Sequence, residues 1–144
     1  MIKKEYLILS LMFLIGFLLR VLFSLYMYEN DIVSGFADDK HYLEYAKQIL
    51  SQGVFVKDIS MLREAMVAPL VPWILALQVY IVGENWLNIF IFNSILGALF
   101  PVVLFYGLKP YFSKFSLLVS SFILTINPMI IYLTPSSGKE TIMY

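Results

Sequence analysis

The chain of 144 residues contains no cysteine and only one histidine. The absence of cysteine excludes disulfides, thiolate metal ligands and a thiol nucleophile, and it leaves the redox compartment undetermined. The single histidine, His41, has no second histidine at metal-ligand spacing, so we interpret it as a surface residue and predict no metal site around it. The net charge is zero and the basic residues form no block, so nucleic acid is not an expected partner.

Charged residues are scarce as well. They make up 14% of the chain, whereas 60% of the residues are hydrophobic and 17% are aromatic. The mean hydropathy is +0.82, and the apolar share lies well above the roughly one half that is typical of soluble domains. This composition excludes a water-soluble fold and predicts an all-α integral membrane protein, whose first partner is the lipid bilayer.

Four apolar segments approach the length of about 20 helical residues that crosses a bilayer core. They are residues 6–28, 66–82, 86–106 and 115–133. The first continues past Arg20 and lacks a small-residue cleavage site, so we interpret it as a retained anchor and not as a signal peptide. The second has Pro69 and Pro72 near its start and is marginal in length, so it either spans the membrane or re-enters it from one side. The chain is therefore expected to form three or four hydrophobic helices.

Residues 29–65 are rich in acidic and basic side chains and are expected to form an external aqueous loop. Apolar residues recur within it at helical spacing, namely Tyr42, Ala46, Ile49 and Leu50. Asp38 is placed to cap the start of this helix, and Gly53 is placed to end it. These signals predict an amphipathic juxtamembrane helix that lies on the membrane surface.

The lysines help to predict the topology, because cytoplasmic loops collect lysine and arginine. If the segment 66–82 stays on the outer side, Lys109 and Lys114 join the N-terminal lysines on the cytoplasmic side. If all four segments span, Lys109 and Lys114 fall outside. The first topology obeys the rule better, and it also brings Glu140 to the same outer side as Asp38. We therefore predict a multi-pass protein of the plasma or inner membrane with a cytoplasmic N-terminus.

The strongest local signal for chemistry is the pair of adjacent carboxylates Asp38 and Asp39, which opens the loop helix directly after the first predicted span. A partly desolvated carboxylate has a raised pKa and can act as a general base toward an acceptor hydroxyl. The simpler interpretation is that Asp38 caps the helix and Asp39 complements its dipole. The residues alone leave both interpretations open.

Several further motifs follow in a fixed order along the chain. They are Tyr42 with Ala46, Ile49 and Leu50 after the acid pair, the Pro-Leu-x-Pro element Pro69-Leu70-Val71-Pro72, Gly83 before the next span, the late Asn127-Pro128 pair, and Glu140 beyond it. In order and spacing these features resemble the GT-C superfamily of membrane glycosyltransferases, particularly its protein mannosyltransferase and aminoarabinose transferase branches. The resemblance extends along nearly the whole chain.

The resemblance implies an enzyme that transfers a sugar from a polyprenyl-phosphate donor. By analogy, Asp38 contacts or deprotonates the acceptor, Glu140 lines the same external cavity, and Asp39 and Tyr42 contribute to substrate binding. The candidates for contacting the lipid phosphate are Lys57, Arg63 and Lys139. Many relatives carry an arginine at the start of the span after the Pro-Leu-x-Pro element, where this chain has Asn88 and Ile89. The sequence does not indicate whether a divalent cation assists.

Other interpretations stay open at this point. Arg20 lies inside the first predicted span, where it either serves a functional site or extends its charge to the headgroups. A non-enzymatic membrane scaffold or assembly subunit is the main alternative, and a transporter, suggested by Arg20, Asn93 and Asn127, is a weaker one. The chain is shorter than this superfamily requires, so we expect a fragment that needs the remaining helices of a longer protein and is inactive alone.

Overall fold

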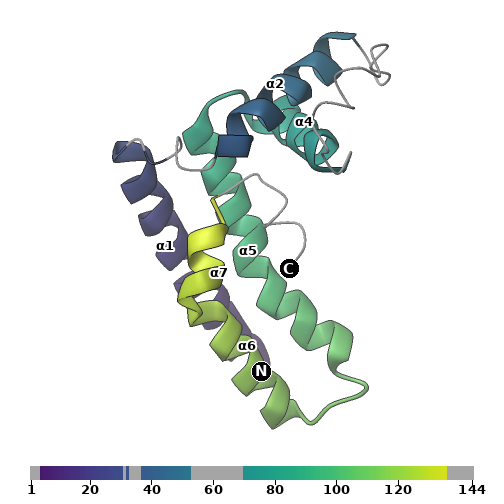
Figure 1. The fold of residues 1–144 in the computed structure, drawn as a ribbon. Coiled ribbons are helices and arrows are strands. Elements are labelled where there is room, and N and C mark those ends of the chain that lie inside the picture. Colours follow the sequence, from purple (N-terminus) through teal and green to yellow (C-terminus); the bar gives the residue numbers. More distant parts are fainter. Residues whose placement is uncertain (1–3, 31, 33–36, 53–69, 136–144) are drawn as a thin grey trace.

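A computed structural model describes residues 4–30, 32, 37–52 and 70–135 of the chain. Regular structure in these residues is helical, which confirms the predicted all-α class for this part of the protein. The helices are α1 (Lys4–Glu29), α2 (Ala37–Gln52), α4 (Leu70–Val82), α5 (Trp86–Leu108), α6 (Lys114–Ile126) and α7 (Pro128–Leu133). Figure 1 shows α1, α5 and α6 side by side, with α2 and α4 across one end.

Two of the helices, α1 and α5, are long and apolar enough to cross a membrane. They correspond to the predicted spans 6–28 and 86–106. One side of α1 carries the exposed leucines Leu7, Leu11, Leu14, Leu18 and Leu22. Such an apolar outer surface suits a helix that faces lipid or the helices of a larger bundle.

The last predicted apolar segment, residues 115–133, is divided into α6 and α7 in the structure. Asn127 has extended backbone angles, with φ −62° and ψ 117°, and its side chain accepts hydrogen bonds from the N–H groups of Met129 and Ile130. Pro128 is the first residue of α7. Because proline provides no N–H group and fits the first turn of a helix, the Asn127–Pro128 pair ends one helix and begins the next.

The segment before α5 forms a short helix. Helix α4 has 13 residues, about 20 Å at 1.5 Å per residue, whereas a bilayer core is about 30 Å thick. Gly83 follows with φ +83°, a conformation that favours glycine, and its N–H donates to the Val79 carbonyl at 2.8 Å. Asn85 then caps α5 by accepting from the Leu87 N–H at 2.9 Å. Residues 66–69, the predicted start of this segment, lie outside the described part, so both the spanning and the re-entrant alternatives stay predictions.

The predicted loop helix is present as α2, from Ala37 to Gln52. It begins one residue before the predicted Asp38 cap, a difference within the usual range for helix ends, and stops next to Gly53, which lies outside the described residues. Tyr42, Ala46 and Ile49 are buried as their spacing predicts. They pack against Val71, Leu75, Ala76 and Val79 of α4 and Ile89 of α5. The apolar face of α2 therefore meets protein, while Leu50 beside it is 42% exposed.

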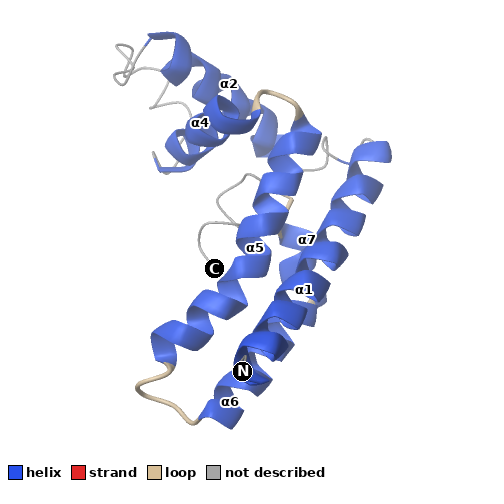
Figure 2. Cartoon of the chain, turned by 180° about the vertical axis from the view of Figure 1, so that it is seen from behind, coloured by secondary structure: helices blue, strands red, loops and turns tan. Residues whose placement is uncertain are grey.

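Small and polar residues line the contact between α1, α5 and α6. Ser24 of α1 and Ser94 of α5 share a buried hydrogen bond of 3.1 Å, and Ser121 of α6 donates to the Pro101 carbonyl of α5 at 3.0 Å. Small side chains let helix backbones approach closely, which is how helices associate where lipid removes the hydrophobic driving force. Figure 2 shows these helices packed together from the opposite side.

Candidate functional site

The predicted acid pair Asp38–Asp39 lies at the edge of the residues that the structure describes. The backbone of Asp38 and Asp39 forms the first turn of α2, but their side chains lie outside the described residues. The other predicted site residues outside the described part are Lys57, Arg63, Lys139 and Glu140. The roles of these residues therefore stay predictions, and the structure bears on them through the elements that hold them.

Tyr42 is the predicted substrate-binding residue whose surroundings are visible. Only 3% of its surface is exposed, and it packs with Ala46 of α2 against α4. This burial gives Tyr42 a packing role in fixing α2 on α4, and a contact with substrate stays a prediction. One helical turn separates Tyr42 from the acid pair, so the same packing anchors the part of α2 that carries Asp38.

A chain of buried hydrogen bonds connects α4 to the residues that follow α7. The Gln78 amide of α4 donates to Asn93 Oδ1 of α5 at 2.8 Å, and the Asn93 amide donates to the Pro135 carbonyl at 3.4 Å. Both side chains are 5% exposed. Sequence reasoning missed Gln78, although a single polar residue in an apolar helix was a signal for such a role.

This hydrogen-bond chain relates the two halves of the predicted site. Helix α2, with Asp38 in its first turn, packs on α4, and α4 is joined through Asn93 to Pro135. In the sequence, Lys139 and Glu140 come four and five residues after Pro135. Figure 1 shows α7 directed toward the end of the bundle where α2 and α4 lie. Helix α2, which carries Asp38, and Pro135, which precedes Glu140 in the sequence, are thus attached to one structural unit.

Arg20 is fully buried between helices, which makes the interpretation that it extends to the headgroups wrong. Its Nη1 donates to the carbonyl oxygens of Gly16 at 3.0 Å and Thr125 at 3.2 Å, and its Nη2 donates to Leu124 at 3.5 Å. The guanidinium group therefore joins α1 to the end of α6. Asn93 and Asn127, the other residues that suggested a transporter, also have structural partners.

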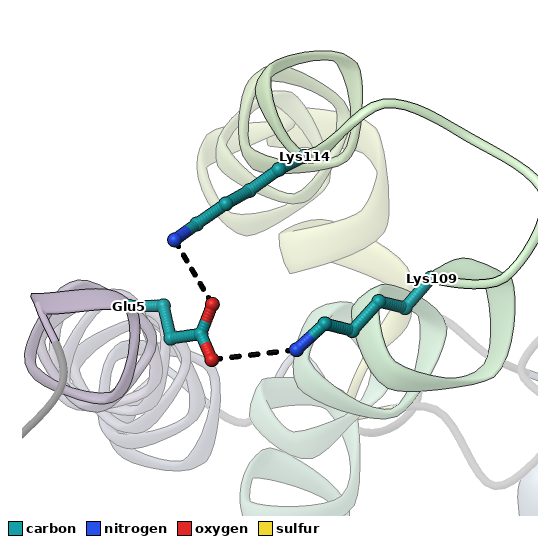
Figure 3. A network of polar contacts seen from close by, with 3 residues as sticks. All are labelled: Glu5, Lys109 and Lys114. Carbon is teal, nitrogen blue, oxygen red and sulfur yellow. Dashed lines mark hydrogen bonds and ion pairs between the residues drawn. The ribbon is translucent and has the colours of Figure 1, made fainter.

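A second charged cluster lies at the opposite end of the bundle, where α1 begins and α5 turns into α6. The Glu5 carboxylate lies 2.9 Å from Lys114 Nζ and 3.3 Å from Lys109 Nζ, and the Glu5 side chain is 8% exposed (Figure 3). The beginning of α1 and the α5–α6 turn therefore share one end, as the predicted grouping of the lysines requires. Sequence reasoning missed Glu5 because its partners lie more than 100 residues away.

Within 4–30, 32, 37–52 and 70–135, no group of three histidine, aspartate or glutamate side chains is close enough to hold a metal ion. Several predicted polar site residues lie outside this part of the chain.

Residues 66–144, more than half of the chain, match the family model for dolichyl-phosphate-mannose-protein mannosyltransferase. The matched region includes the Pro69–Pro72 element, the Asn127–Pro128 break and Glu140, whereas Asp38 and Asp39 precede it. No curated protein and no solved structure matches the chain.

Proposed function

Because the chain belongs to the dolichyl-phosphate-mannose-protein mannosyltransferase family, we propose that this integral membrane protein transfers a sugar from a polyprenyl-phosphate donor to an acceptor at the outer membrane face. The family match carries the proposal, since it covers the region from the Pro-Leu-x-Pro element to Glu140. The apolar spanning helices α1 and α5 suit a donor whose lipid chain stays in the bilayer.

In the proposed reaction, Asp38 removes the proton from an acceptor hydroxyl while the oxygen attacks the anomeric carbon of the donor sugar. A new carbon–oxygen bond forms, and the bond between the anomeric carbon and the phosphate oxygen breaks. The lipid phosphate leaves with the electron pair, and the proton stays on Asp38. Attack opposite the leaving group inverts the anomeric configuration.

The departing lipid phosphate requires nearby positive charge. We assign this role to Lys139, Lys57 and Arg63, with a divalent cation as an alternative source of charge. Glu140 and Asp39 shape the acceptor side of the site. Support comes from the attachment of α2 to α4 and of α4, through Asn93, to Pro135. This framework connects the helix that carries Asp38 to the residue from which the chain continues toward Glu140.

A transfer assay tests the proposed activity directly. Membranes that contain the full-length protein are expected to move label from radioactive polyprenyl-phosphate mannose into a water-soluble or protein fraction. Membranes prepared without the protein provide the background. If the label stays in the lipid extract in both preparations while the protein is present and folded, the proposal fails and the scaffold interpretation becomes the better one.

The topology gives a second prediction. Residues 1–144 contain no cysteine, so single cysteine probes report without background once any cysteine elsewhere in the protein is replaced by serine. We expect probes at Asn30 and Ser137 to react with an impermeant maleimide from outside, and a probe at Ser113 to react only after the membrane is opened. This result puts both predicted acids on one aqueous side. The reverse pattern for Ser113 and Ser137 would mean that α4 crosses the membrane and that Asp38 and Glu140 are separated.

A further inference from the structure

The break between α6 and α7 leaves two backbone carbonyl groups without their usual helical N–H donors. In an α-helix the carbonyls of Leu124 and Thr125 accept from the N–H groups four residues later, at Pro128 and Met129. Proline has no N–H group, and the Met129 N–H donates to Asn127 Oδ1 at 2.9 Å. The Asn127–Pro128 pair therefore removes the normal partners of two successive carbonyls, in a place where an unpaired polar group is costly.

Arg20 supplies donors to these same two carbonyls from another helix. Its Nη1 lies 3.2 Å from the Thr125 oxygen, and its Nη2 lies 3.5 Å from the Leu124 oxygen. The planar guanidinium group can reach two neighbouring acceptors at once, and its positive charge complements the negative end of the α6 dipole. Nη1 also donates to the Gly16 carbonyl one turn back in α1, which fixes the side chain along its own helix.

The end of α7 lies against the same surface of α5 as Arg20. A β-carbon built on Gly97 would lie 2.9 Å from Arg20 Nε and 3.0 Å from the methyl group of Thr134. Thr134 is the C-cap of α7 and is 5% exposed. Glycine at position 97 thus lets the guanidinium group and the last turn of α7 pack together on one part of α5.

From these contacts we infer that Arg20 is a positioning residue that caps the open end of α6 from another helix and thereby fixes the direction of α7. The Asn127–Pro128 break and the buried arginine act together, because the break leaves the Leu124 and Thr125 carbonyls without helical donors and Arg20 donates to both. For transfer, this inference rests on the proposed function, in which the residues after α7 include Lys139 and Glu140. The coupling between Arg20 and the break does not depend on that function.

A double-mutant cycle tests the coupling in the full-length protein. Arg20→Met is introduced into the native chain and into an Asn127→Ala/Pro128→Ala chain, where α6 can continue and pair its own carbonyls. Unfolding by SDS is followed through maleimide labelling of a Ser94→Cys reporter, because Ser94 is fully buried and residues 1–144 contain no other cysteine. Any cysteine elsewhere in the full-length protein is first replaced by serine. Arg20→Lys keeps the positive charge but replaces the guanidinium group, which can donate to both carbonyls, with a single ammonium group. It is therefore expected to destabilise the protein less than Arg20→Met.

In the native background, Arg20→Met is expected to raise the unfolding equilibrium constant about 10- to 100-fold, because the buried Thr125 carbonyl and the part-buried Leu124 carbonyl lose their donor. In the Asn127→Ala/Pro128→Ala background, the same change is expected to have an effect of about threefold or less. In the native background, Arg20→Lys should raise the unfolding equilibrium constant by more than about threefold but by less than Arg20→Met does. Its effect should likewise be smaller in the Asn127→Ala/Pro128→Ala background. Equal effects of Arg20→Met in the two backgrounds would overturn the inference.

The consequence for transfer is measured separately. The Asn127→Ala/Pro128→Ala protein should remain folded by the Ser94→Cys reporter and lose about tenfold or more in kcat, because a continuous helix redirects the residues after α7. A folded variant that transfers sugar at the native rate would overturn the positioning role. If the native protein itself transfers no sugar, the proposed function fails, while the unfolding cycle still decides the coupling between Arg20 and the break.

Discussion

The Asp38→Asn protein is expected to transfer sugar with a kcat about 10²–10⁴-fold below that of the native protein, the range usual for loss of a general base. Asparagine keeps the size of the side chain and its ability to accept a hydrogen bond at the start of α2. It cannot take a proton from the acceptor hydroxyl. Since Tyr42 and Ala46 anchor α2 on α4, the helix itself should stay in place. The measurement is the initial rate of label transfer at saturating donor.

Glu44→Gln is the matched control, because Glu44 is an exposed carboxylate six residues further along the same helix. It is expected to transfer sugar at nearly the native rate. Asp39→Asn should have a smaller effect than Asp38→Asn if Asp39 only shapes the site. A native rate for Asp38→Asn would remove Asp38 from the chemistry and leave it as a helix residue, as the alternative interpretation of the acid pair holds.

The sequence predicted those parts of the fold that depend on local patterns. Apolar length alone located α1 and α5, and the spacing of Tyr42 and Ile49 located α2 and its buried face. Gly83 marked the end of α4, since a residue with φ of +83° is favoured to be glycine. In each case the determining signal lies within the segment that forms the element.

The partners of the interior polar residues could not be predicted in this way. Arg20 binds carbonyls that lie 104 and 105 residues away, and no local pattern distinguishes this arrangement from an arginine that extends to the headgroups. The division of residues 115–133 into two helices could not be predicted from local patterns either. A proline in an apolar helix can kink it or end it, and the outcome depends on what satisfies the freed carbonyls.

For the candidate site, the sequence could predict candidate residues and their order along the chain, but not their arrangement in space. The acid pair, the Pro69 element and Glu140 indicated the family, and the match over residues 66–144 confirms the family. Sequence order could not show that Gln78 and Asn93 connect α4 to Pro135, because these contacts depend on how the helices pack. The resemblance thus named candidates for the chemistry, and packing relates the elements that hold them.

Gly97→Ala is expected to lower the free energy of unfolding by about 1–3 kcal/mol, the usual cost of overfilling a packed interior. The added methyl group would lie 2.9 Å from Arg20 Nε and 3.0 Å from the Thr134 methyl group. Arg20 cannot easily withdraw, because its hydrogen bonds to Gly16 and Thr125 hold the guanidinium group. Gly97→Leu should be worse and separate α1 from α5. SDS unfolding with the Ser94→Cys reporter gives the free energies.

Gly107→Ala in the same helix is the control for the change in backbone freedom. A β-carbon at Gly107 meets nothing within 4 Å, so only the helix preference of alanine over glycine acts, and this variant should be neutral or more stable by up to about 1 kcal/mol. The two substitutions are chemically identical, and they differ in what surrounds the added methyl group. If Gly97→Ala proved as stable as Gly107→Ala, the close approach of α5 to Arg20 and Thr134 would be wrong, and with it the packing that holds the end of α7.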